Sequence, residues 1–132
     1  MLEEDDYGVA RGREAVVKCT QLLLSLDGVV AIQAEDPDAP HDRRFTGHDL
    51  EVTLDPDVWS GVTSVYVEVK ASSGKISRFF KKVGDMIGLP IAPTTEAEIK
   101  VWLVQNRQVY VAMDQSEHYV LSEFTRQVRD MR

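Results

Sequence analysis

Apolar residues in the first part of the chain recur at helical spacing and then give way to a strand-like run. Between residues 11 and 26 they stand at Ala15, Val16, Cys19, Leu22, Leu23 and Leu26, which predicts a helix with one apolar face. An Asp-Gly pair at residues 27–28 predicts its end. Val29–Ala34 suits a strand and the Pro- and Asp-rich residues 35–42 suit a loop. Residues 1–10 carry acids and no periodic apolar pattern, so we expect a flexible acidic tail there.

Alternation of polar and apolar residues predicts two further strands. Residues 49–54 alternate in this way and end at the Asp-Pro-Asp sequence of residues 55–57. In Ser64–Lys70, three valines fall on one face of the predicted strand, whereas Glu68 and Lys70 fall on the other. Both charged side chains are therefore expected to point to the same side of the sheet.

The pattern between residues 95 and 113 admits two interpretations. Residues 99–104 and 109–113 are rich in β-branched and aromatic residues, which favours two strands joined by a hairpin. A helix that begins at Thr95, with Glu98 three residues later in a capping box, is the alternative. We expect the two strands.

Two more helices are predicted, one before and one after this region. Residues 77–87 place apolar side chains at helical spacing, at Phe79, Phe80, Val83, Met86 and Ile87. Asp114 and Glu117 match a capping box, and an apolar stripe follows them as far as Met131. A C-terminal helix packed on the sheet is therefore expected.

Composition favours one folded domain. The chain has 132 residues, of which 43% are hydrophobic and 28% charged, values close to those of ordinary globular domains. We expect a single domain over residues 11–132. No apolar run approaches the roughly 20 residues of a membrane-spanning helix, so a cytoplasmic location is expected. Cys19 is the only cysteine, which excludes an intramolecular disulfide and a zinc cluster of several thiolates.

The charge of the chain is unevenly distributed. The net charge is −7, which is unusual for a protein that binds phosphate groups. Acids outnumber bases strongly in residues 1–60, whereas bases slightly outnumber acids in residues 61–132. A short basic stretch contains Lys70, Lys75, Arg78, Lys81 and Lys82. The last four are candidates for nucleic-acid binding, and the alternative is that they form the solvated side of an amphipathic helix.

Three charged residues and the order of elements resemble the PD-(D/E)XK nuclease superfamily. Its signature is an acid at the start of the second core strand and an acid, any residue and Lys in the third. Asp49 occupies the first position, and Glu68 and Lys70 occupy the second motif. Many members add a Glu on the first helix, where this chain has Glu14. The Pro that precedes the first acid in the family is His48 here.

The resemblance, which covers roughly residues 11–105, implies both a fold and an activity. It implies an α/β fold with an αβββαβ restriction-endonuclease-like core, a mixed central sheet flanked by helices, and an extra C-terminal strand and helix. The pattern is most similar to archaeal Holliday junction resolvases and virus-type replication-repair nucleases, and Gly74-Lys75 matches a further feature of these subgroups. It implies a Mg²⁺-dependent endonuclease acting on DNA as a homodimer, with branched or junction DNA as the substrate and Mn²⁺ as a substitute metal.

The chemistry of these residues is consistent with that activity. Magnesium prefers carboxylate oxygens and water, and often takes only one or two protein carboxylates, which Asp49 and Glu68 could supply. A bound cation polarises the phosphate and lowers the pKa of water, while Lys70 offsets charge that develops on the phosphate oxygens. By the resemblance, Glu14 would hold a metal-bound water or a second ion.

Two other functional classes remain open. The chain could be a catalytically inactive PD-(D/E)XK-like domain that binds nucleic acid or a protein partner, for which an acidic surface is suited. It could also be an unrelated α/β interaction domain, because an acid, Val and Lys in sequence are common on a solvated strand face. The sequence has no Gly-rich Walker pattern, so an ATP site is not expected.

Overall fold

The computed structural model describes the backbone of residues 2–34, 49–87 and 95–132, and the side chains of these ranges from residue 11 onward. The predicted loop at residues 35–42 and His48 lie outside the described residues. Within these ranges the chain forms a four-stranded mixed sheet and four α-helices, so the predicted α/β class is confirmed.

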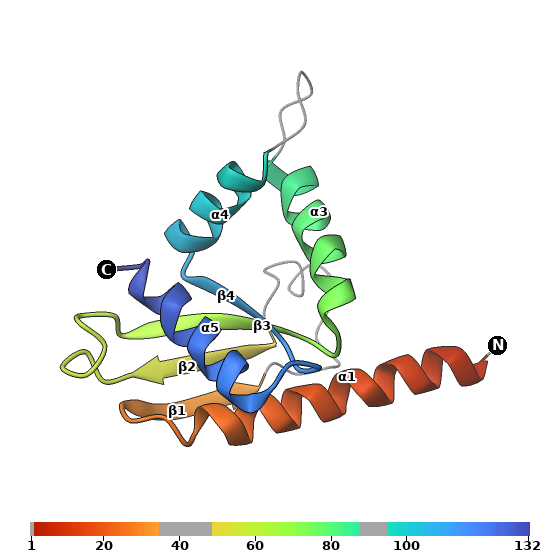
Figure 1. The fold of residues 1–132 in the computed structure, drawn as a ribbon, viewed down its shortest axis with the longest axis horizontal. Helices are drawn as coiled ribbons and strands as arrows, with labels where there is room; N and C mark the ends of the chain where they lie inside the picture. The colour runs from red at the N-terminus through yellow and green to blue at the C-terminus, as the bar shows by residue number, and fades with distance from the viewer. Residues whose placement is uncertain (1, 35–48, 88–94) are drawn as a thin grey trace.

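The first helix is longer than its apolar pattern predicted. Helix α1 spans Leu2–Leu23, so residues 2–10, which were expected to be a flexible tail, form its first turns. In Figure 1 this N-terminal part extends beyond the sheet. The chain then turns at Gly28, whose φ is +81° and whose position would bring an added Cβ to 2.6 Å from Cβ of Val58. Glycine is required there because both the backbone conformation and the close approach exclude a side chain.

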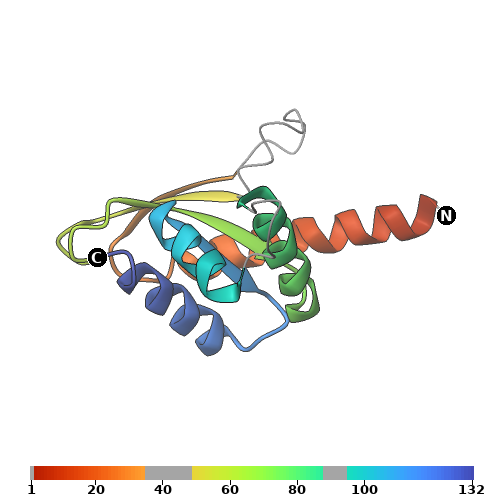
Figure 2. The same ribbon diagram turned by 90° about the horizontal axis from the view of Figure 1, so that it is seen from above.

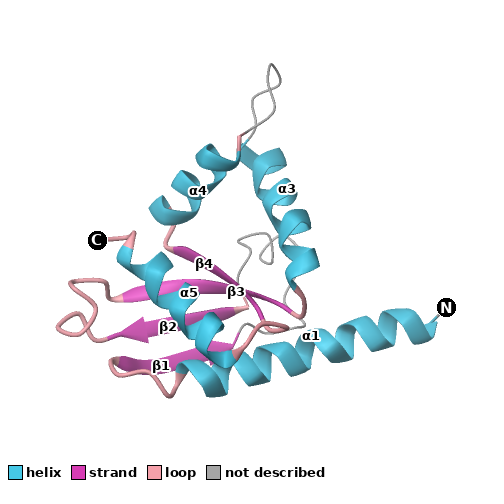
Figure 3. Cartoon of the chain, in the orientation of Figure 1, coloured by secondary structure: helices cyan, strands magenta, loops and turns pink. Residues whose placement is uncertain are grey.

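The sheet has the strand order β1-β2-β3-β4. Its strands are β1 (Val29–Ala34), β2 (Leu50–Leu54), β3 (Ser64–Lys70) and β4 (Gln108–Ala112). The first three strands are antiparallel to one another, whereas β4 runs parallel to β3. A parallel pair needs a crossover connection. The crossover consists of the 3-10 turn η1 (Ser73–Lys75), α3 (Ile76–Ile87) and α4 (Glu96–Gln105), and Figure 3 shows this helical pair beside the sheet.

The prediction of a strand at residues 99–104 is wrong, because this segment lies in α4. The side chain of Thr95 accepts a hydrogen bond of 3.2 Å from the backbone N–H of Glu98 and donates one of 2.9 Å to its carboxylate. Ile99 and Leu103, one helical turn apart, are buried. The capping residues and this apolar pair therefore outweigh the β-branched composition. As a consequence, β4 is the fourth strand of the sheet, and no extra strand follows it in the described chain.

Side chains pack on both faces of the sheet. On one face, the valines of β3 and β4 pack against α1 and against α5 (Glu117–Arg129), in a core that includes Cys19, Leu23 and Phe124. A smaller cluster from α3 and α4 contains Phe79, Val83, Ile99 and Leu103, with Tyr110 of β4 packed against it. Because Tyr110 alternates with buried valines along β4, this cluster lies on the opposite face. Figure 2 shows the same arrangement of helices from above.

None of the helices formed by residues 2–34, 49–87 and 95–132 is both long and apolar enough to cross a bilayer.

Candidate active site at the end of strands β2 and β3

Asp49 lies immediately before β2 and is fixed by two hydrogen bonds to β3. Its backbone N–H donates to the carbonyl oxygen of Val67 at 2.8 Å, and its Oδ2 accepts from the N–H of Val69 at 2.7 Å. The carboxylate thus takes the place of a backbone carbonyl at the end of the β2–β3 ladder. Because an unpaired buried N–H is costly, the sheet itself favours an acceptor at this position and holds the side chain in one orientation.

Glu68 occupies the same end of the ladder on β3. It follows Val67, the register partner of Leu50, and Leu50 follows Asp49, so the two acids stand across from each other at the strand ends. The Glu68 residue is only 9% exposed. Its pKa is raised to about 7 by burial and by the negative charge of Asp49, against the opposing effects of Lys70 and Lys82. The structure therefore brings these two carboxylates within electrostatic range in a largely dehydrated position.

Lys70 lies beside Glu68, as the alternation along the strand predicted. Its Nζ is 2.8 Å from Oε1 of Glu68, and its side chain is 28% exposed. The same Nζ is 5.9 Å from the ring centroid of Phe79 on α3, within the range of a cation–π contact. The ammonium group is therefore held between an acid on its own strand and an aromatic ring on the crossover helix, with part of it accessible to a solute.

Cys19 of α1 lies beneath this group of residues. Its pKa is raised to about 12 by burial and by the nearby charge of Asp49. A thiol with so high a pKa stays protonated at neutral pH and is a poor nucleophile and metal ligand. Cys19 therefore contributes packing under the site, and not a reactive group.

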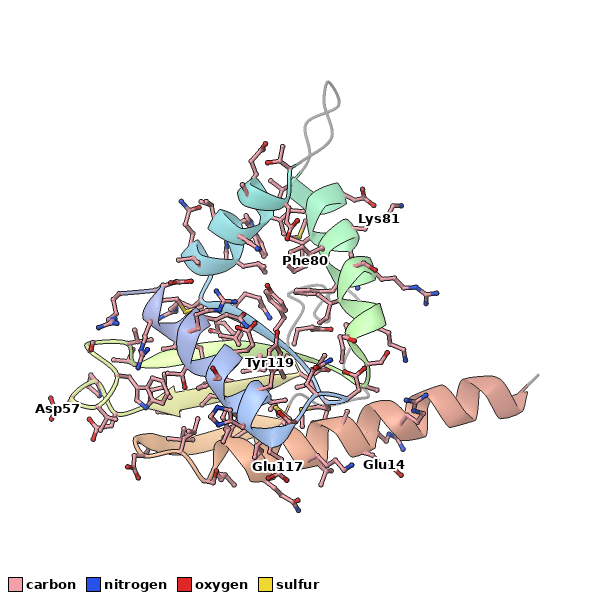
Figure 4. The ribbon with its side chains drawn as sticks, viewed as in Figure 1. Glu14, Asp57, Phe80, Lys81, Glu117 and Tyr119 are labelled. Atoms are coloured by element: carbon pink, nitrogen blue, oxygen red, sulfur yellow. The ribbon has the colours of Figure 1, made fainter. Side chains whose placement is uncertain are left out.

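Glu14 is not brought to the pair of acids. Ala15 and Cys19, one turn apart, are buried on the face of α1 that packs on the core, whereas Glu14 is exposed. One residue corresponds to about 100° of rotation around a helix, and Glu14 lies on the solvent side of α1 (Figure 4). In the portions of the chain that the structure describes, no three His, Cys, Asp or Glu side chains form a group that could hold a metal ion. Any cation site among these residues would rest on Asp49 and Glu68 alone.

The four basic candidates do not share one environment. Lys75 lies in η1, and Arg78, Lys81 and Lys82 are exposed on α3. Lys82 lies close enough to the acids to lower the pKa of Glu68. Residues 75, 78 and 82 are spaced by three and four and so follow one side of the helix. Lys81 is turned about 100° away, forms an ion pair with Asp85 at 3.9 Å and projects outward in Figure 4.

One residue beside the site, Asp114, had been assigned a different role from the sequence. It matched a capping box with Glu117, but the N-cap of α5 is Ser116, whose side chain accepts from the N–H of Tyr119. The carboxylate of Asp114 instead accepts hydrogen bonds from the N–H of Ser73 at 3.0 Å and from its hydroxyl at 3.1 Å. It therefore joins the end of β4 to η1, which carries Lys75. The sequence signal for this contact was the position of Asp114 directly after the strand that became β4.

The donor set fits a small divalent cation. Magnesium is commonly held by one or two protein carboxylates, with water and substrate phosphate oxygens as its other ligands. Asp49 and Glu68 offer two carboxylates at one strand end, and burial together with the negative charge of Asp49 raises the pKa of Glu68. A cation between them would lower this pKa, and the ammonium group of Lys70 acts in the same direction.

Comparisons of the chain with protein-family models, with curated proteins and with solved structures found no match.

Proposed function

We propose that the chain is a metal-dependent endonuclease of the PD-(D/E)XK type that hydrolyses phosphodiester bonds in DNA. One observation carries the proposal. Asp49 and Glu68 stand together at the ends of two neighbouring strands, and the ammonium group of Lys70 lies 2.8 Å from Glu68. Burying an acid beside a second acid costs free energy unless a cationic group compensates for it, and such clusters of perturbed acids are frequent at functional sites.

The order and pairing of the strands support the same proposal. A helix precedes an antiparallel β1-β2-β3 meander, and a helical crossover returns the chain to β4, parallel to β3. With α3 and α4 counted together as the crossover, this element order is compatible with the αβββαβ core that the superfamily resemblance implies, and it supports the proposal. The resemblance expects the two acids at the start of the second core strand and in the third, and Asp49 precedes β2 while Glu68 lies in β3.

Each residue has a distinct task in the proposed reaction. Asp49, oriented by its bond from Val69, and Glu68 would hold Mg²⁺ or Mn²⁺. A cation held there would polarise the phosphate and lower the pKa of a coordinated water molecule. Lys70 would then offset the negative charge that develops on the phosphate oxygens. Of the basic residues, Lys75 and Lys82 are best placed to hold neighbouring phosphates.

Branched DNA as the substrate and a homodimer as the acting species are part of the proposal through the resemblance. A junction has two strands of equivalent geometry, and a symmetric pair of active sites is the simplest means of cutting both.

The proposal is tested by incubating the protein with plasmid DNA and with synthetic four-way junctions, in Mg²⁺, in Mn²⁺ and in EDTA. Cleavage is expected with either metal and should disappear in EDTA and in the Glu68→Gln and Asp49→Asn variants. Glu51→Gln is the matched control, because Glu51 is an exposed acid on the same strand as the candidate site. Cleavage that survives in Glu68→Gln, or is lost equally in Glu51→Gln, contradicts the assignment.

A catalytically inactive domain that binds nucleic acid or a protein is the second candidate. The observation that favours it is the Lys70–Glu68 ion pair, which already neutralises the buried acid, together with the exposure of Glu14 away from the site. In that case the wild-type protein binds DNA or a partner in EDTA and in Mg²⁺ alike, and no DNA is cut under either condition.

A further inference from the structure

A groove of about 310 Å³ runs along the outer edge of β4, between α5 and the start of α3. Its lining includes Ser73, Ile76, Tyr110, Gln115, Tyr119 and Glu123. Tyr119 is 50% exposed and lies on the side of α5 that faces this groove (Figure 4). The volume is at the lower end of the range for small-ligand sites, so the groove can accept one planar group.

Two structural links place this groove beside the candidate active site. Tyr110 is the register partner of Glu68, and neighbouring strands lie about 4.8 Å apart. Ser73 belongs to the same three-residue turn as Lys75, and Asp114 fixes that turn to the end of β4. A nucleotide whose phosphate lies near Lys70 and Lys75 would therefore have its base or the adjacent base at the mouth of the groove.

The chemistry of the lining favours a nucleobase over a phosphate group. Among the described residues that line the groove there is no Lys or Arg, and Arg126, which contacts the lining residue Glu123 at 2.6 Å, is ion-paired with that residue and with Asp130. Tyr119 instead offers an exposed aromatic ring for stacking, the interaction by which proteins hold unpaired bases of any sequence. The ring of Tyr110, which packs edge-on against Phe80 with centroids 5.0 Å apart, forms part of the groove wall. Gln115 adds an amide group that can hydrogen bond to a base edge, whereas the carboxylate of Glu123 already accepts from the hydroxyl of Tyr119 at 3.2 Å and from Nε of Arg126 at 2.6 Å.

The groove is poorly suited to an added peptide strand, although it follows a sheet edge. Strand addition requires exposed backbone donors and acceptors along the edge. At Tyr110 both are occupied, because its N–H donates to Oε1 of Gln127 at 3.0 Å and its carbonyl accepts from Nε2 of the same residue at 2.8 Å. The side chain of Gln127 thus occupies the place of a neighbouring strand.

We infer that the groove lined by Tyr110 and Tyr119 binds an unpaired nucleobase of the substrate, next to the phosphodiester bond that is cut. The inference rests on the proposed nuclease function and narrows its substrate class. Bases of a continuous duplex are stacked and paired, and moving one out costs free energy. The site would therefore favour DNA with unpaired nucleotides beside the cut.

The test measures binding and cleavage of two DNAs of the same sequence, a continuous duplex and a duplex with a short unpaired segment that carries a fluorescent adenine analogue. Binding is measured in EDTA and cleavage in Mg²⁺. Tyr119→Ala should weaken binding of the second DNA about five-fold or more and leave duplex binding unchanged. Stacking should quench the analogue in the wild-type protein and in Tyr119→Phe, which keeps the ring, but not in Tyr119→Ala.

Val30→Ala is the control, because Val30 is an exposed apolar residue on β1, at the opposite edge of the sheet. Equal weakening for both DNAs, or no effect of Tyr119→Ala on either, overturns the nucleobase site while wild-type cleavage still supports the nuclease. If the wild-type protein neither binds nor cuts either DNA, the nuclease proposal fails and the nucleobase site fails with it.

Discussion

Oδ2 of Asp49 accepts a hydrogen bond of 2.7 Å from the N–H of Val69, the residue between Glu68 and Lys70. This bond joins the first acid of the candidate site to the strand that carries the second acid and the amine. The carboxylate therefore has a structural task, completing the β2–β3 ladder, as well as its proposed catalytic task. Substitutions at residue 49 can separate the structural task from the catalytic one.

Asp49→Asn is expected to keep the fold and lose the proposed activity. The amide oxygen of Asn can still accept from Val69, whereas Ala leaves that N–H without its side-chain acceptor, at a cost of about 1–3 kcal/mol in the free energy of unfolding. Chemical denaturation should therefore show Asp49→Asn close to the wild type and Asp49→Ala clearly less stable. The two variants should be equally inactive in DNA cleavage. Equal stability of all three proteins would show that the bond to Val69 contributes little.

The raised pKa of Glu68 predicts that stability falls as pH rises. The carboxyl has a pKa of about 7 in the folded protein, against an ordinary value of 4.5. Between these two pH values the folded state holds a proton that the unfolded state has lost, so raising the pH favours unfolding. The contribution of this group should fall by on the order of 3 kcal/mol across the window and become level once the pH is well above the folded-state pKa.

Glu68→Gln isolates that effect because the amide does not titrate. Urea denaturation at several pH values should show the variant gaining stability relative to the wild type between pH 4.5 and pH 7.5. Parallel stability curves for the two proteins would contradict a raised pKa. Adding Mn²⁺ to the wild type at pH 7.5 should recover stability, since a cation that binds only the folded state stabilises it, and Glu68→Gln should respond much less.

The sequence alone predicted the position of a side chain correctly where that position depends on neighbouring residues of the chain. Alternation along Ser64–Lys70 placed Glu68 and Lys70 on one side because the strand repeat is two residues. The same periodic reasoning separates Glu14 from the apolar face of α1 that Ala15 and Cys19 define, and the structure confirms this separation. For Glu14, the family resemblance led to an expectation that the helix geometry does not support.

Other features depended on contacts that no local pattern contains. The segment at residues 99–104 has the composition of a strand, and the capping residue Thr95 together with packing against α3 makes it a helix. The carboxylate of Asp114 accepts a hydrogen bond from Ser73, which lies 41 positions earlier in the sequence. This contact depends on the parallel pairing of β4 with β3.

Lys82 and Lys81 are neighbours in sequence and should differ in their effect on DNA binding. Lys82 lies near Glu68, whereas Lys81 is paired with Asp85 on another side of α3. Lys82→Ala should weaken binding to any DNA and reduce the slope of log affinity against log salt concentration by about one, as expected for one lost phosphate contact. Lys81→Ala is the matched control with little change in slope. Equal slopes for the two variants would remove Lys82 from the proposed DNA-binding surface.

Asp114→Ala should loosen the turn that carries Lys75 while leaving the core intact. The carboxylate accepts from both the N–H and the hydroxyl of Ser73, and these bonds lower its pKa. A lowered pKa means that the tie is present above the ordinary value for Asp and is lost as pH falls through the folded-state value. Amide hydrogen exchange at Ser73 should therefore be faster in Asp114→Ala than in the wild type at pH 6, with DNA affinity reduced.

Asp114→Asn and Asp57→Ala make this prediction specific. Asn keeps one acceptor for the N–H of Ser73, so exchange and DNA affinity should recover in part. Asp57 is an exposed acid in the β2–β3 connection, labelled in Figure 4 away from the candidate site, and its loss removes the same charge without touching the turn. Removing an acid by itself should favour DNA binding, so Asp57→Ala is expected to leave DNA affinity unchanged or slightly higher, and an equal reduction in both variants would contradict the role of the Ser73 contact. A change confined to Asp114→Ala, together with faster exchange at Ser73, means that the position of Lys75 depends on a carboxylate supplied by the neighbouring strand.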